Sequence, residues 1–127
     1  MKTQIIFLLL ATSALTTISI TTPMLGDSIV DCVNDVRGVI ADAAKVAADH
    51  TDIGAIIQCG KDAYNGIRSC SAAYNDIRSS ACRSAVDTFI SHARSDADNL
   101  VHNPKSAIGD AADVARCAEA LVNACGN

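Results

Sequence analysis

Six cysteines constrain this 127-residue chain more than any other feature, and all of them lie in its last hundred or so residues. They are Cys32, Cys59, Cys70, Cys82, Cys117 and Cys125. An even number of cysteines in a short chain that follows a secretory leader indicates a disulfide framework. A zinc site would need close Cys-x-x-Cys or Cys/His pairs, and the sequence has none. We therefore expect three disulfides in one small, cysteine-rich domain.

The first 22 residues predict a secretory signal peptide. Lys2 precedes an apolar run over residues 5–10, and no further charge occurs before Asp27, which is the pattern of a cleaved leader. We expect cleavage between residues 19 and 26, which leaves residues 27–127 as a single helical domain. The predicted location is secreted and extracellular, with no membrane span in the mature chain.

The composition of the mature part excludes some partners. It carries nine Lys and Arg against fourteen Asp and Glu, a net charge of −5 with neutral histidines. An acidic domain without a cationic patch does not favour binding to nucleic acid.

The mature part is also alanine-rich, with two Tyr, one Phe and no Trp, so its core is thin. Each disulfide stabilises a domain by about 2–4 kcal/mol, so the disulfides together contribute an amount comparable with the whole free energy of unfolding of a typical domain, about 5–15 kcal/mol. We therefore expect reduction of the disulfides to unfold the protein.

Apolar residues recur at spacings of three and four through the mature chain, a pattern that predicts helices. No segment has the alternation of a strand. The expected fold is an all-α, disulfide-stapled bundle with helices at about 28–49, 52–68, 71–98 and 104–125. We place the central break at residues 69–71, with Ser71 as the cap of the third helix. Asn103-Pro104 is the sharpest predicted helix start.

The same helices limit how the cysteines pair. Neighbouring cysteines within one helix would lie more than about 11 Å apart, whereas bonded Cα atoms lie within about 7 Å. This excludes Cys59–Cys70, Cys70–Cys82 and Cys117–Cys125, and leaves several of the fifteen pairings open. In an up-down-up-down bundle Cys32, Cys70 and Cys125 fall near one end, and Cys59, Cys82 and Cys117 fall about two turns further in. Because three cysteines at one level cannot all pair with each other, one bond must join the two levels, and Cys32 and Cys117 differ least in height. The expected pairing is therefore Cys32–Cys117, Cys59–Cys82 and Cys70–Cys125.

The central stretch between Cys59 and Cys82 contains two near-copies of one octapeptide, at residues 63–70 and 73–80. Tyr and Arg are favoured anchors of interfaces. The candidate recognition residues are therefore Tyr64, Arg68, Tyr74 and Arg78. The alternative is that both tyrosines lie at the edge of the core with their hydroxyls at the water boundary. Ten residues of α-helix turn the side chain by about 80° from register, so we expect the copies to face different ways.

Catalytic chemistry has little support in the sequence. The histidines are His50, His92 and His102, and adjacent residues such as Ser91 and His92 do not face each other on a helix. His92 with Asp96, and Asp98 with His102, have the spacing of metal ligands, but a solvated helix face is the simpler interpretation. We expect no catalytic residues, no cofactor and no metal site, and hence a protein that is not an enzyme.

The secretory leader, the alanine-rich acidic helices and the long gap between Cys82 and Cys117 resemble small secreted insect proteins of the TsetseEP-domain type. The spacing from Cys59 to Cys70 is wider than the cysteine pair of that family. The resemblance implies an extracellular, non-enzymatic protein. The sequence thus predicts a secreted binding or interaction protein of a fluid such as saliva, venom, gut or reproductive secretion. The alternative is a carrier that encloses a small hydrophobic ligand in the bundle core.

Overall fold

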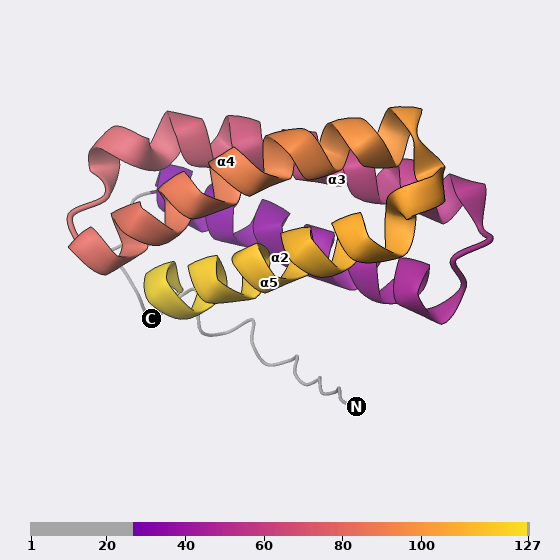
Figure 1. The fold of residues 1–127 in the computed structure, drawn as a ribbon. Coiled ribbons are helices and arrows are strands. Elements are labelled where there is room, and N and C mark those ends of the chain that lie inside the picture. The colour runs from indigo at the N-terminus through magenta and orange to yellow at the C-terminus, as the bar shows by residue number, and fades with distance from the viewer. Residues whose placement is uncertain (1–26, 127) are drawn as a thin grey trace.

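Four long helices make up most of the computed structural model, which describes residues 27–126. They are α2 (Asp27–Ala48), α3 (Ile53–Ala73), α4 (Ser80–His102) and α5 (Ala107–Cys125), with short 3₁₀ turns at Tyr74–Asp76 and Pro104–Ser106 (Figure 1). The expected all-α bundle is confirmed. The predicted signal peptide and its cleavage region lie outside the described residues.

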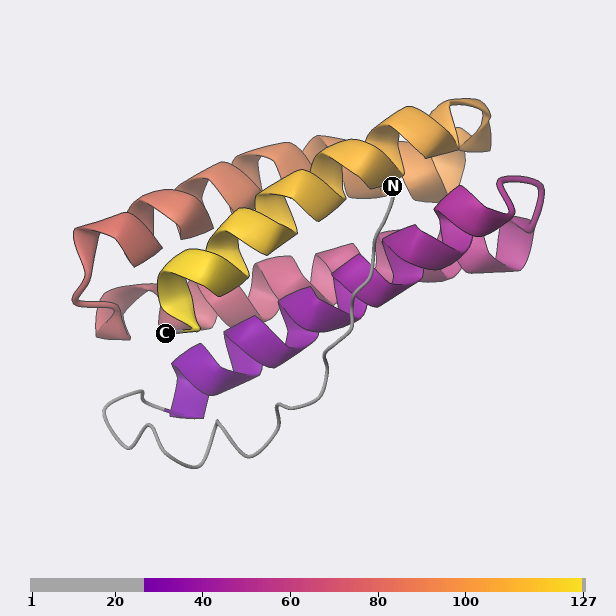
Figure 2. The ribbon, with the colours of Figure 1, turned by 90° about the horizontal axis from the view of Figure 1, so that it is seen from below.

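The helices are arranged as two antiparallel hairpins. Figure 2 shows the α2–α3 hairpin as one layer and the α4–α5 hairpin as the other. Each helix packs on its neighbours in sequence, and α2 packs on α5 to close the ring, whereas α3 and α5 face each other across the diagonal with few contacts. The connections 49–52 and 103–106 therefore share one end of the bundle, which we call the loop end. Residues 74–79 join the hairpins at the opposite end.

The break between α3 and α4 lies later than the sequence pattern predicts. α3 continues through Ser71 to Ala73, and the capping residue of α4 is Ser79, whose hydroxyl accepts a hydrogen bond from the backbone N–H of Cys82 at 3.2 Å. The connection is anchored because Ile77 is 2% exposed and its carbonyl accepts a 2.5 Å hydrogen bond from Arg83. Ser71 and Ser79 are both of a residue type that caps helices well. The buried Ile77 holds the connection in place just before Ser79, and the helix begins after that serine.

Two further helix starts, those of α3 and α5, agree more closely with the sequence. Asp52 caps α3 by accepting a hydrogen bond from the N–H of Ala55 at 3.1 Å. Asn103 precedes Pro104 at the start of the last helical segment, as predicted, but the first turn is 3₁₀ and the α-helix proper begins at Ala107.

Two disulfides are present, Cys32–Cys70 and Cys82–Cys125, with Cα–Cα distances of 4.5 and 4.8 Å. Cys59 and Cys117 are free, so the expectation of three disulfides is wrong. None of the three excluded neighbour pairs forms, but the chosen pairing Cys32–Cys117, Cys59–Cys82, Cys70–Cys125 is wrong. The reason is the later break. Because α4 begins at Ser80, Cys82 lies in its first turn, at the same end as the other bonded cysteines, rather than two turns in.

The core is built from small side chains and close helix contacts. Its largest fully buried side chain is Phe89, and the others are mainly Val, Ala and Cys with a few Ile and Leu. Gly60 and Gly66 allow α3 to approach α4: a Cβ on Gly60 would lie 2.7 Å from Val101 Cγ2 and 3.1 Å from the carbonyl oxygen of Ala97. These glycines lower the helix propensity of α3, but the absence of a Cβ atom allows α4 to pack closely against it. Close packing matters in a domain whose core side chains are small.

Alanine substitutions at glycines distinguish these roles. We expect Gly60→Ala to destabilise the protein, since overpacking costs about 1–3 kcal/mol and exceeds the gain in helix propensity of up to about 1 kcal/mol. Gly38→Ala is the matched control because nothing lies within 4 Å of its added Cβ; it should stabilise by about 0.5–1 kcal/mol. Urea unfolding measures both. Equal stability of the two variants would contradict the close contact between α3 and α4.

Candidate functional site

Both tyrosines of the repeat lie against α4. The Tyr64 hydroxyl donates to Asp98 at 3.4 Å and the Tyr74 hydroxyl donates to Asp87 at 3.1 Å. Both rings are half-buried against the core. The copies were expected to face different ways, but Tyr74 has left the α-helix for the 3₁₀ turn, so both side chains reach the same neighbour. Their positions are those of tyrosines at the edge of a core.

The arginines of the repeat are exposed. Arg68 donates to Asn65 within its own helix turn at 3.3 Å, and Arg78 lies in the connection between the hairpins. The arginine that contacts a repeat tyrosine is Arg83, whose guanidinium lies 5.5 Å from the centre of the Tyr74 ring. The two tyrosines contact aspartates that lie eleven residues apart on α4, and the role of the four candidate residues in recognition stays a prediction.

Two aspartates are buried in the bundle, one in each hairpin. Asp42 on α2 is 8% exposed and Asp96 on α4 is 6% exposed, and the Oδ2 atom of each is buried without a hydrogen-bond partner among residues 27–126. A buried carboxylate is costly unless a proton or a cation neutralises it. The pKa of Asp42 is raised to about 7, first by burial and then by the neighbouring carboxylate of Asp62, whereas Lys45 acts in the opposite direction.

Asp96 has a comparable neighbour in Asp113 on α5. Burial raises the pKa of Asp96 to about 8, and the Asp113 and Asp110 carboxylates act in the same direction. The pKa of Asp113 is lowered, first by a hydrogen bond from Asp96 and then by one from His92. The proton of this pair therefore belongs to the buried Asp96, and Asp113 is the anion.

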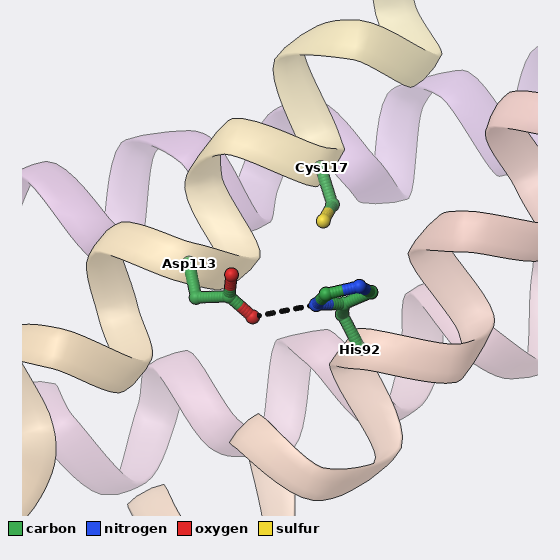
Figure 3. A group of neighbouring side chains, drawn as sticks. All are labelled: His92, Asp113 and Cys117. Atoms are coloured by element: carbon green, nitrogen blue, oxygen red, sulfur yellow. Dashed lines mark hydrogen bonds and ion pairs between the residues drawn. The ribbon is translucent and has the colours of Figure 1, made fainter.

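Asp113 joins His92 and Cys117 in a cluster between α4 and α5. Figure 3 shows the three side chains converging, with His92 on α4 and the other two one turn apart on α5. One donor atom from each lies within 4.8 Å of the others. His92 Nδ1 lies 3.0 Å from Asp113 Oδ2, and Arg116 donates to Asp113 Oδ1 at 2.9 Å. The His92 side chain is 49% exposed, so the cluster is open to solvent.

The free thiols are not activated nucleophiles. Burial raises the pKa of Cys59 to about 12, and nearby carboxylates, beginning with Asp42, add to the effect. Burial and the Asp113 carboxylate also raise the pKa of Cys117. A nucleophilic cysteine needs a lowered pKa to be a thiolate at neutral pH, so neither thiol has the electrostatics of a catalytic cysteine.

The cluster is the part of the site that sequence reasoning missed. Of the two pairs with metal-ligand spacing, Asp98 and His102 lie 3.7 Å apart on the surface, whereas His92 turns to Asp113 rather than to Asp96. The available signal was a pair of four-residue spacings, His92 with Asp96 and Asp113 with Cys117. Only the antiparallel packing of α4 on α5 brings them together.

A pocket of about 120 Å³ lies at the loop end, lined by His50 and residues 104–109. Two large apolar side chains near this end are exposed, Ile53 by 51% and Ile108 by 54%. Sites for drug-sized ligands enclose about 300–1,000 Å³, so this pocket is a surface depression rather than a ligand chamber.

Comparisons of the chain with protein-family models, curated proteins and solved structures give no significant match. The resemblance to TsetseEP-type proteins stays a prediction from the sequence. Among the described helices, none is long and apolar enough to cross a membrane.

The buried Asp42 predicts a falling stability with rising pH. An ordinary Asp titrates near pH 4, so between about pH 4 and 7 the unfolded chain releases a proton that the folded protein keeps, and the contribution of Asp42 to stability is lost across that window. Asp42→Asn mimics the protonated form. We expect the melting temperature of Asp42→Asn minus that of the wild type to increase as the pH rises from 4.5 to 8. A change of 1 kcal/mol in stability corresponds to about 4–8 °C in melting temperature.

Asp31→Asn removes an exposed carboxylate from the same helix and corrects for the change in net charge. A difference between Asp42→Asn and wild type that stays constant over this pH range would show that Asp42 is ionised in the folded protein throughout.

Proposed function

We propose that the protein is a secreted, extracellular, non-enzymatic protein that binds another protein through its outer surface. The observation that carries this proposal is that the large apolar side chains of Ile53 and Ile108 are exposed at the loop end, while α3 packs closely on α4 inside the bundle. The predicted leader and the two disulfides support an oxidising, extracellular destination. The resemblance in leader, composition and cysteine spacing to TsetseEP-type proteins also favours an extracellular, non-enzymatic protein.

The packing of α3 on α4 leaves little room for an internal ligand. Methyl-sized additions at Gly60 and Gly66 would already meet Val101 and Phe89 at 2.7 and 3.2 Å. Phe89, Leu100 and Leu121 are fully buried. These contacts favour a surface partner over the alternative, a carrier of a small hydrophobic ligand in the core.

The loop end is the part of the surface that we expect to bind. It combines the exposed Ile53 and Ile108 with the depression beside His50 and Pro104. Protein interfaces have apolar centres with polar rims, and this end has both kinds of group. Its apolar area is small, which fits a weak or transient contact.

Substitutions at the loop end test the proposal. Mature protein immobilised by its C-terminus should retain a partner from the secretion in which it accumulates, and the double variant Ile53→Asp/Ile108→Asp should lose that partner. The control Ala120→Asp/Ala41→Asp adds the same charges at exposed positions away from this end and should retain it. Circular dichroism checks that all variants fold.

The carrier hypothesis gives a different result in the same preparation. A carrier would release stoichiometric lipid on extraction, and added fatty acid would raise its melting temperature by linkage. Either result, or a partner that both double variants retain equally, would contradict binding through the loop end.

A further inference from the structure

The cluster between α4 and α5 has the composition of a transition-metal site. It brings together an imidazole, a carboxylate and a thiol, with one donor atom of each within 4.8 Å of the others (Figure 3). Zn²⁺ is bound by His, Asp and Cys in tetrahedral sites, and sites with three protein ligands keep one position open. A thiolate and an imidazole disfavour Ca²⁺ and Mg²⁺, which take oxygen ligands.

The nitrogen and oxygen donors of the cluster already have nearly the spacing of two ligands on a tetrahedral ion. Two ligand atoms about 2.0–2.1 Å from a tetrahedral ion lie roughly 3.3 Å apart, and His92 Nδ1 lies 3.0 Å from Asp113 Oδ2. Asp113 and Cys117 are four residues apart on α5, so they share one face of that helix. The exposed side of His92 gives an ion access from solvent.

A second observation is the buried Asp96, one helical turn after His92 on α4. It is 6% exposed, and its Oδ2 atom accepts no hydrogen bond from the described residues. A proton neutralises a buried carboxyl group that lies beside another carboxylate, and a bound cation can take the place of that proton. Arg116, whose side chain is 69% exposed, donates to Oδ1 of Asp113, so that Oδ2 of Asp113 faces His92.

Cys117 is the third donor of the cluster. The residue is 9% exposed and its thiol is free, although the chain has two disulfides. A buried thiol that points at a histidine and a carboxylate has the position of a metal ligand. Binding would replace the thiol proton by the ion, because the thiolate is the ligand.

From these contacts we propose that His92, Asp113 and Cys117 bind one Zn²⁺ between α4 and α5, with Asp96 either as the fourth ligand or as the group that orients Asp113. The site joins two helices of one hairpin and lies on the side of the bundle, so it is distinct from the loop end.

Calorimetric titration of Zn²⁺ into the oxidised mature protein, without reductant, tests the site. We expect one Zn²⁺ per chain. His92→Ala removes an exposed ligand and should weaken binding at least about tenfold. His102→Ala removes an exposed histidine from the same helix and should leave the affinity unchanged. Zn²⁺ should also raise the melting temperature of the wild type but not that of His92→Ala.

Co²⁺ as a probe identifies the sulfur ligand. The wild type should show the near-ultraviolet charge-transfer absorption of a cobalt–thiolate bond. Cys117→Ala should lose this band, and Cys59→Ala, which removes the other free thiol, should keep it. The proposal would be overturned by no saturable Zn²⁺ binding, by a full affinity in His92→Ala, or by a Cys59–Cys117 disulfide in the isolated protein, since the ligand thiol would then be absent.

Discussion

Each disulfide closes one helical hairpin, and the rest of the structure depends on this constraint. Cys32–Cys70 joins the free ends of α2 and α3, and Cys82–Cys125 does the same for α4 and α5, opposite the connecting loops. With sequence separations of 38 and 43 residues, each crosslink removes about 4 kcal/mol of chain entropy from the unfolded state in the loop-closure model. Among the described residues no disulfide joins the two closed hairpins, which are held together by residues 74–79, by packing and by hydrogen bonds such as that from Tyr64 to Asp98.

This constraint explains how a core of such small side chains suffices. Alanine and valine contribute little apolar area per residue, and Phe89 is the one aromatic residue that the described core fully buries. The glycines on α3 compensate by bringing α4 close. The buried Asp42 and Asp96 oppose folding unless they are neutralised, so each hairpin contains a position whose charge state affects its stability.

The sequence was sufficient to predict the helices because their apolar spacing is regular. It was insufficient for the central break, because Ser71 and Ser79 are both acceptable caps and only the burial of Ile77 selects the second. This error of eight residues moved Cys82 from the end of the bundle to its interior and produced the wrong pairing. The cluster of His92, Asp113 and Cys117 was missed for a related reason: two short spacings on separate helices carry no information about which helices pack together.

The central claim is that each hairpin is covalently closed on itself and that no disulfide joins the two hairpins. Proteolysis of the unreduced mature protein, with thiols blocked before digestion, followed by mass spectrometry of the crosslinked peptides, tests this claim directly. The account predicts the bridges Cys32–Cys70 and Cys82–Cys125, with Cys59 and Cys117 recovered as blocked thiols. A bridge that links a cysteine of residues 27–73 to one of residues 80–125 would contradict it.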